Sequence, residues 1–387
     1  MASPFIEDPV DLGARIVRGT LRRERVFRDW QNPLAFPDDF LYERYRFSVV
    51  TGRSRALTVP QTLCIALCYF ATGSFMYAVG DAEDLSKNTV CSAIHKVARA
   101  LTELLDAFIV FPGHLPTQSI KEDFYDIAGF SRVIGAIDCT HIPISARLGE
   151  NEADYVNRKS FHSLNIQMTC DHQCMVTSIE AKWPGSVHDS RIFRESALCH
   201  RFEQGRTTVH CISFCYGLFT GVLLGDRGYA CQPFLMTPYP DPDAGPQTRF
   251  NVALARTRAR IEMTFGILKA RFTCLRGLRV APDRACRIIT ACVVLHNVAT
   301  IRKERAPPVN PQPPDVVDPI TLDHPTGRAV REAITQQFFA STHTQRTHLL
   351  FRALRDQAPA YIKELLQPYT TRRTLRSSDA GCSSLQA

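Results

Sequence analysis

Between residues 131 and 301, short apolar runs typical of buried strands alternate with stretches of helical periodicity. This alternation limits the fold more than any other feature of the sequence. The predicted strands are residues 133–137, two runs within 162–183 joined at 171–173, and 222–224. One predicted helix begins at Asp189, and two others cover residues 252–272 and 284–301. Strands followed by helices in this order indicate a mixed α/β domain, in which helices flank one sheet.

The overall composition agrees with a folded domain. The chain has 387 residues, of which 45% are hydrophobic and 22% charged, a balance typical of a soluble globular protein of two to three domains. It excludes a disulfide-stapled miniprotein and a wholly disordered chain. No uninterrupted apolar run reaches the roughly 18 to 20 residues of a membrane helix, so no membrane partner is predicted. The first residues contain acids and lack an apolar core, which predicts no secretory signal.

The 14 cysteines are scattered from Cys64 to Cys382 without a CxxC pair. Structural zinc sites bring cysteines and histidines together at short, regular spacings, and the sequence does not contain those spacings. It therefore predicts reduced cysteines that pack as small hydrophobic side chains in an intracellular protein.

Residues 58–125 are predicted to form an all-α region with the layout of a helix-turn-helix. One helix ends at Gly73, and Ser86 is a good N-cap for the next. If the region binds DNA, the second helix faces a groove or phosphates with Lys87, Asn88 and Lys96. Two other interpretations stay open: a helical hairpin that only packs, and a module that docks a protein.

Three further segments flank these regions. Residues 1–57 predict a basic helical arm with six arginines between positions 15 and 28 against one acid, either a solvated face or a nucleic-acid arm. The net charge is +8, and only eight of the 46 basic residues are lysine, which suits bidentate phosphate contacts. Residues 306–327 predict an extended proline-rich linker, and 328–387 predict C-terminal helices and a disordered tail.

Four carboxylates stand where a sheet directs side chains into a cleft. Asp138 follows the first apolar run, Asp189 opens a helix, Asp226 ends the strand 222–224, and Glu262 lies in the long helix. Converging carboxylates repel one another, so a folded site that holds them needs protons or divalent cations. Oxygen ligands favour Mg²⁺ or Mn²⁺ over zinc. Such a site permits a metal-dependent nuclease or a strand-transfer enzyme.

The helix that carries Glu262 also carries two cations near it. An apolar stripe that includes Ile261 and Leu268 packs this helix on the core, and Glu262 borders the stripe. Arg258 and Lys269 lie on the same side, about one turn before and two turns after Glu262. Two interpretations stay open: a plain ion-pair network, or a metal ligand beside cations that bind phosphate.

Four ordered sequence blocks resemble those of the PIF/Harbinger DDE transposases. The blocks are GAIDCTHI at 135–142, PGSVHDSR at 184–191, LGDRGY at 224–229 and RIEMTFGILKARF at 260–272, with shorter matches at 235–239 and 295–297. The resemblance spans about residues 58–340. It implies an RNase H-like catalytic domain over residues 126–305, with a mixed sheet flanked by helices, preceded by the helix-turn-helix region.

The resemblance also implies roles for the charged residues. The residues to which it gives a metal role are Asp138, Asp189, Asp226 and Glu262. In RNase H-like enzymes the central carboxylates come from the first strand, the fourth strand and a later helix. The implied catalytic residues are therefore Asp138, Asp226 and Glu262, with Asp189 as a fourth ligand or a support. Arg258 and Lys269 are then expected to bind DNA phosphates.

Two departures from the family pattern bear on activity. Cys139 stands where the family usually has glycine, so its side chain either crowds the metal or points away. Residues 207–220 lengthen the loop before the Asp226 strand with apolar residues, where the family has a short polar connection. An insertion that impairs folding is one interpretation of this second departure.

These inferences lead to one function and one alternative. The function is a DNA nuclease that uses Mg²⁺ or Mn²⁺ and does not transpose. The alternative is a non-catalytic, domesticated DNA-binding or adaptor protein. By the resemblance, the expected partners are DNA, a Myb/SANT-like protein that supplies sequence-specific binding and nuclear entry, and a second copy in a homodimer. The expected location is the nucleus and the cytoplasm.

Overall fold

The computed structural model describes five stretches of the chain: residues 57–82, 85–145, 148–204, 221–308 and 323–340. Several predicted segments lie outside the described residues. They are the basic arm, the stretch 207–220, most of the proline-rich linker and everything beyond residue 340.

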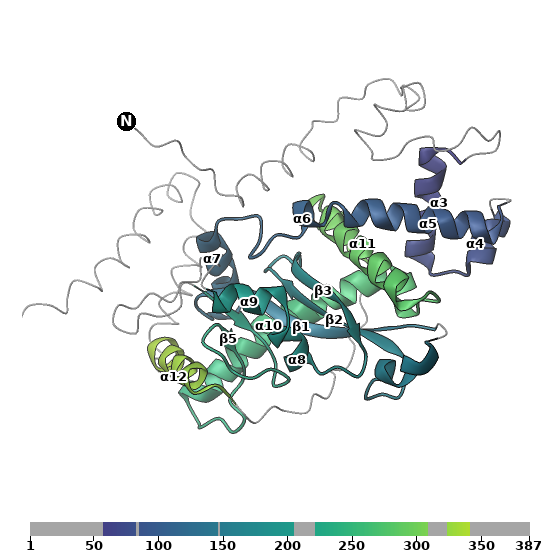
Figure 1. Cartoon of the computed structure of the whole chain (residues 1–387). Helices are drawn as coiled ribbons and strands as arrows, with labels where there is room; N and C mark the ends of the chain where they lie inside the picture. The colour runs from purple at the N-terminus through teal and green to yellow at the C-terminus, as the bar shows by residue number, and fades with distance from the viewer. Residues whose placement is uncertain (1–56, 83–84, 146–147, 205–220, 309–322, 341–387) are drawn as a thin grey trace, which may run out of the picture.

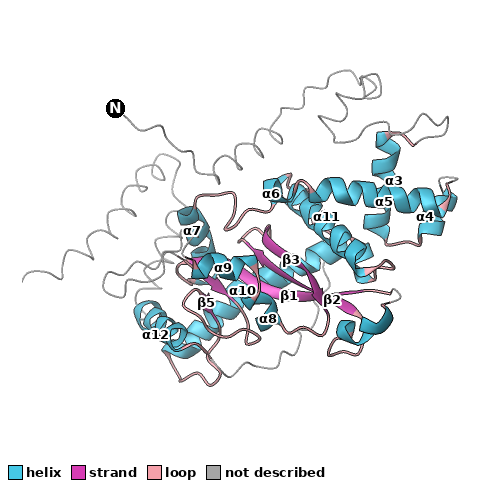
Figure 2. Ribbon diagram, in the orientation of Figure 1, coloured by secondary structure: helices cyan, strands magenta, loops and turns pink. Residues whose placement is uncertain are grey.

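A five-stranded mixed sheet forms the centre of the molecule (Figure 2). Its strands are β1 (Val133–Pro143), β2 (Ser163–Cys170), β3 (Val176–Pro184), β4 (Val222–Leu224) and β5 (Leu235–Met236). Their order across the sheet is β3-β2-β1-β4-β5. The pairs β1–β2 and β2–β3 are antiparallel, whereas β1–β4 and β4–β5 are parallel. A mixed sheet with flanking helices fits the RNase H-like fold that the sequence predicts.

Helices cover both faces of this sheet (Figure 1). The described helices are α3 (Val59–Thr72), α4 (Met76–Ala82), α5 (Lys87–Thr102), α6 (Leu105–Phe108), α7 (Thr117–Ala128), α8 (Asp189–Arg194), α9 (Ala197–Glu203), α10 (Pro246–Arg271), α11 (Pro282–Ile301) and α12 (Pro325–Phe339), with 3-10 turns η2 (Gly149–Tyr155) and η3 (Thr273–Arg276). Of these, α3 and α4 pack on α5 away from the sheet. Neighbouring side chains of a strand point to opposite faces. On β1, Ile137 packs with α8 and α9, whereas Ile142 packs with α10 and α11. One face thus belongs to α8 and α9 and the other to α10 and α11.

The helical region has the caps that the sequence predicts. Gly73 ends α3 with a left-handed φ of 63°, and the Ser86 hydroxyl accepts a hydrogen bond from the Thr89 N–H at the start of α5. The buried side chains of α3 and α5 belong to the same hydrophobic core as those of α11 and β2. The helical region is therefore continuous with the core of the sheet. Its use as a helix-turn-helix stays a prediction.

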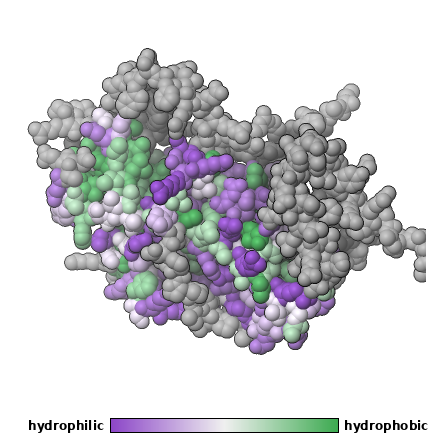
Figure 3. All heavy atoms as spheres, turned by 180° about the vertical axis from the view of Figure 1, so that it is seen from behind, coloured by the Kyte–Doolittle hydropathy of each residue, from purple (hydrophilic) through white to green (hydrophobic). Residues whose placement is uncertain are grey.

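One face of α3 is apolar and open. Leu63 and Leu67 are 36% and 37% exposed, and Cys64 and Cys68 on the same helix are also exposed. Seen from behind, hydrophobic residues gather at this end of the molecule (Figure 3). The described cysteines are free, and all of the described ones other than Cys64 and Cys68 are buried or half-buried. The prediction that cysteines pack in the core is thus wrong for Cys64 and Cys68, because this face of α3 has no neighbour among the described helices.

The structure moves several predicted boundaries. Asp138 lies inside β1 rather than after it, because the pairing of β1 with β2 continues from Ala136 to Pro143. The polar residues that suggest a turn are thus part of the ladder. The long helix begins at Pro246 instead of residue 252, since proline needs no N–H partner in the first helical turn.

Among the described helices, α11 alone is long and apolar enough to cross a membrane by length and composition. It packs against α5 and β3, and ten of its side chains are buried. Its first two turns carry Asp283, Arg284 and Arg287. These features are those of a core helix in a folded domain.

Candidate active site

Three of the four predicted carboxylates surround one arginine. Asp138 comes from β1, Asp226 follows β4 by two residues, and Glu262 lies on α10. Arg258 lies one turn before Glu262 on the same helix. Its Nη1 donates to Asp138 Oδ2 at 2.7 Å, and its Nη2 donates to Glu262 Oε1 at 2.5 Å. The fold therefore brings together residues that are up to 124 positions apart in the sequence.

The cluster around Arg258 contains three carboxylates and one guanidinium, and much of it is buried. The pKa of Asp138 is raised to about 7: burial raises it most, Arg258 lowers it, and the charges of Asp226 and Asp189 raise it. Burial also raises the pKa of Asp226, again against the effect of Arg258. Glu262, with 48% of its side chain exposed, is the most open member. One guanidinium thus does not compensate the carboxylates that it faces.

A tight turn after β4 fixes the Asp226 side chain. The buried residues of β4 lie between β1 and β5, and the Gly225 N–H donates to Met236 O at 3.0 Å. Directly afterwards, Asp226 Oδ1 accepts a hydrogen bond from the Gly228 N–H at 2.9 Å. A carboxylate that caps its own turn has little rotational freedom. Asp226 is therefore held at the carboxyl end of a parallel strand, where ligand sites of such sheets lie.

Asp189 is held by different contacts. It is the first residue of α8 and is buried, and its Oδ1 accepts a hydrogen bond from Asn165 Nδ2 at 2.8 Å. The same amide donates to Val187 O at 3.0 Å. Asp189 also raises the pKa of Cys139, second to the effect of burial. These contacts lie on the α8 side of the sheet, yet the charge of Asp189 also raises the pKa of Asp138 and of Asp226. Its role as a fourth ligand or as a support stays a prediction.

Cys139 points away from Arg258. It neighbours Asp138 in β1, so the two side chains leave opposite faces of the strand. Its sulfur lies 3.3 Å from the Tyr229 hydroxyl, and it packs against the cluster formed with α8 and α9. The Cys139 side chain therefore points away from the three carboxylates around Arg258, whereas on the other face it contacts Asp189.

The second predicted cation of α10 also reaches β1. Lys269 Nζ donates to Thr140 Oγ1 at 2.7 Å and to His141 O at 3.1 Å. His141 Nδ1 lies 3.0 Å from Ser163 Oγ. His188 caps α8 through its Nδ1, which accepts from the Ser190 N–H, and its charge lowers the pKa of Asp226. Lys269 therefore lies against β1 two turns along α10 from Glu262, and His188 lies near Asp226 at the start of α8.

The predicted DNA contacts of the helical region lie elsewhere. Lys87, Asn88 and Lys96 are exposed on α5, and Lys87 Nζ lies 4.8 Å from the centre of the Tyr77 ring. None of these three belongs to the cluster around Arg258.

The donor set suits a divalent cation in its chemistry. Carboxylate oxygens are the ligands that Mg²⁺ and Mn²⁺ prefer, and the raised pKa of Asp138 shows that added positive charge would stabilise the cluster. Among the described residues, no three His, Cys, Asp or Glu side chains form a ready ligand group. Arg258 contacts one oxygen of Asp138 and one of Glu262.

Some residues near the site were not singled out by the sequence. Asn165, which holds Asp189, does not stand out from its neighbours in a single sequence, and Tyr229, which contacts Cys139, was part of the block at 224–229 without an assigned role. A signal did exist for Asn297, a polar residue in a strongly apolar helix. Its side chain accepts from Val176 N at 2.8 Å and donates to Val176 O at 2.7 Å. It thereby fixes edge strand β3 to α11.

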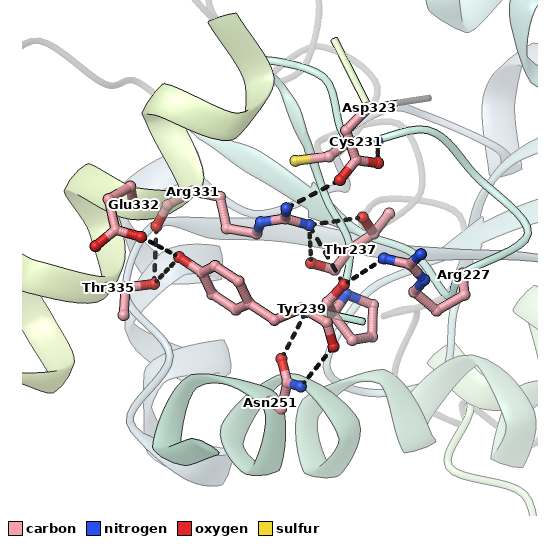
Figure 4. A network of polar contacts seen from close by, with 10 residues as sticks. Arg227, Cys231, Thr237, Tyr239, Asn251, Asp323, Arg331, Glu332 and Thr335 are labelled. Carbon is pink, nitrogen blue, oxygen red and sulfur yellow. Dashed lines mark hydrogen bonds and ion pairs between the residues drawn. The ribbon is translucent and has the colours of Figure 1, made fainter. Parts of the chain in front are cut away.

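The block at 235–239 also has a structural role (Figure 4). Arg331 of α12 donates to Thr237 O and Pro238 O, both at 3.3 Å, and to Asp323 Oδ2 at 2.9 Å. The Tyr239 ring lies 4.4 Å from this guanidinium. The network fastens α12 to the loop after β5.

Comparison with known proteins agrees with this geometry. Residues 137–297 match the model of the DDE superfamily endonuclease, and the segment includes the cluster around Arg258. The class of the central domain is therefore a DDE endonuclease.

Curated relatives extend the similarity beyond that domain. The chain is 36% identical to "Putative nuclease HARBI1" of Homo sapiens and of Bos taurus over 274 residues, 68% of this chain and 75% of either relative. It is 27% identical to "Protein ALP1-like" of Arabidopsis thaliana over 268 residues, 67% of this chain and 64% of that relative. The chain belongs to the family of Harbinger transposase-derived nucleases. No solved structure matches it.

Proposed function

We propose that this protein is a divalent-metal-dependent nuclease that hydrolyses phosphodiester bonds of DNA. The observation that carries the proposal is the convergence of Asp138, Asp226 and Glu262 on a single arginine, beside the middle of β1 and the carboxyl end of β4. Burial raises the pKa of Asp138 to about 7, so this cluster favours additional positive charge. Membership of a family of transposase-derived nucleases supports the same reaction.

Each side chain has a role that follows from its contacts. Asp138, Asp226 and Glu262 would hold Mg²⁺ or Mn²⁺, which when bound supplies a Lewis acid and lowers the pKa of a bound water. The Gly228 N–H orients Asp226 for this purpose. Lys269, at the end of β1, would bind a phosphate of the DNA backbone. Asp189 is a positioning residue that connects α8 with β2 through Asn165.

A nicking assay tests this proposal. Supercoiled plasmid is incubated with the full chain in Mn²⁺ or in EDTA, and Glu262→Gln serves as the matched variant. The expected result is nicking in Mn²⁺ by the wild type alone. DNA binding in EDTA without nicking in Mn²⁺ would instead identify the non-catalytic DNA-binding or adaptor protein.

For the helical region, the proposed partner is DNA or a Myb/SANT-like protein. The exposed residues Lys87, Asn88 and Lys96 support contact with phosphates. The apolar face with Leu63 and Leu67 supports docking of a protein. That protein is either the Myb/SANT-like partner or a second copy of this chain. A nuclear and cytoplasmic location belongs to the same proposal.

Charge substitution separates these partners. If α5 binds DNA, Lys87→Gln with Lys96→Gln weakens DNA binding and lowers its salt dependence. Unchanged DNA binding in this variant would exclude the DNA contact and leave protein docking or simple packing as the role of the region.

A further inference from the structure

Arg258 uses the oxygens that a divalent cation would need. Its two terminal nitrogens donate to Asp138 Oδ2 and Glu262 Oε1, and Asp226 adds to the field at the guanidinium. Only 16% of the Arg258 side chain is exposed, so water screens these contacts weakly. A planar guanidinium spans two carboxylates well because its donors are fixed in a fork.

A guanidinium and a metal ion cannot both neutralise the same oxygens at full strength. Each is a cation, and each needs the lone pairs of Asp138 and Glu262. Arg258 cannot lose its charge at any ordinary pH, so it can leave only by rotating its side chain. Resting on α10 one turn before Glu262, it has the length to swing toward the open side of Glu262.

We propose that Arg258 is an internal competitor of the divalent cation: it holds Asp138 and Glu262 together until the cation displaces it, and it then binds the DNA phosphate. This inference rests on the proposed metal-dependent nuclease. In this scheme Arg258 raises the metal concentration that the protein requires. It also couples metal binding to phosphate binding, because only the displaced guanidinium has free donors for phosphate oxygens.

Mn²⁺ titration of the full chain by calorimetry tests the competition. Arg258→Gln keeps a polar side chain but removes the charge. It is expected to bind Mn²⁺ about tenfold or more tightly than the wild type, the change that the loss of one charge-assisted hydrogen bond produces. The matched control is Arg256→Gln, an exposed arginine on the same helix, whose Mn²⁺ affinity is expected to stay that of the wild type. Unchanged or weaker Mn²⁺ binding by Arg258→Gln overturns the proposal.

Thermal unfolding in EDTA and in Mn²⁺ keeps the test decisive if the variant is unstable. In EDTA, Arg258→Gln is expected to unfold at a lower temperature than the wild type. Added Mn²⁺ is expected to raise the unfolding temperature of Arg258→Gln more than that of the wild type. Arg258→Lys keeps the charge but cannot span two carboxylates, so its Mn²⁺ affinity should lie between those of the other forms. If both variants stay unfolded in saturating Mn²⁺, the cation does not replace Arg258 and the proposal is wrong.

The test also separates this inference from the proposed function. Absence of Mn²⁺ binding by the wild type and by every folded variant refutes the metal site itself. Mn²⁺ binding that is equal in wild type and Arg258→Gln refutes only the competition.

Discussion

Two largely buried arginines face carboxylates in this protein, and their surroundings differ in charge. Arg331 meets one acid, Asp323, and directs its other donors to backbone carbonyls of the loop after β5. Arg258 meets Asp138 and Glu262 directly and feels Asp226 as well. The first network is balanced, whereas the second carries more negative than positive charge.

This difference in charge balance distinguishes a structural network from a candidate functional site. A balanced buried pair needs nothing from outside, and removing one partner leaves the other charge uncompensated. An unbalanced cluster is stabilised by any further cation that reaches it, and such clusters concentrate at functional sites. The charge balance around each arginine therefore fits a structural role for α12 and supports the proposed catalytic role of the cluster on α10.

The largest expected effect is on cleavage. Asp138→Asn, Asp226→Asn and Glu262→Gln should each lower the rate of Mn²⁺-dependent plasmid nicking about a thousandfold or more, about 4 kcal/mol of transition-state stabilisation. Asp323→Asn is the control from the balanced network and should keep the rate of the folded protein. Activity retained in all three site variants would break the comparison and remove the metal assignment.

Next in size is the effect of breaking the balanced network. Arg331→Met leaves Asp323 buried without its partner and should lower the free energy of unfolding by about 3 to 5 kcal/mol. Urea denaturation measures this change, and Mn²⁺ should not restore the lost stability. A loss below about 1 kcal/mol would mean that α12 does not depend on this pair.

Buried His296 makes the free energy of unfolding depend on pH. This contribution has to be known before the pH dependence of the two arginine networks can be compared. Burial lowers the pKa of His296 to about 4 from 6.5, while its contact with Cys174 O opposes the shift. The unfolded chain binds this proton more readily, so the stability from His296 is complete above pH 6.5 and is lost as the pH falls toward 4. The free energy of unfolding should fall by about 3 kcal/mol over this window from this residue.

Denaturation at a series of pH values measures that slope. His296→Gln keeps a donor for Cys174 O and should flatten the slope between pH 6.5 and 4. A slope that the variant leaves unchanged would assign the dependence to other groups.

The smallest effect is expected at Cys139. Cys139→Ala removes a sulfur packed against Tyr229 and should cost about 1 kcal/mol of stability, with nicking unchanged. Thermal unfolding and the nicking assay measure the two quantities on one preparation. A clear gain in nicking would show that the cysteine hinders the carboxylates after all.

The sequence predicted what local chemistry decides. Gly73 and Ser86 set helix ends through backbone conformation and capping, and both predictions are confirmed. The turn between β2 and β3 is also confirmed, because Asp171 accepts backbone hydrogen bonds from Gln173 and Met175. The apolar run at 222–224 was sufficient to predict β4, the strand before Asp226.

The contacts that the sequence could not predict depend on partners far along the chain. Arg258 and Asp138 are 120 residues apart, so the sequence could not predict their contact. Helical spacing on α10 predicted only that Arg258 could reach Glu262. The continuation of β1 past Asp138 depends on its pairing with β2 and not on its own polar residues. Asn165 and Asp189 belong to different elements that only the folded sheet brings into contact.

The shared core of α3, α5, α11 and β2 has a consequence for where DNA would be cut. Two modules joined by a pliable tether allow breaks at scattered distances from the anchoring contact. Here α5 packs on α11, and α11 packs on β3, so α5 shares one hydrophobic core with the sheet that carries Asp138. If α5 binds DNA and the carboxylates cut it, as proposed, breaks should fall at a constant number of base pairs from the contact made by α5.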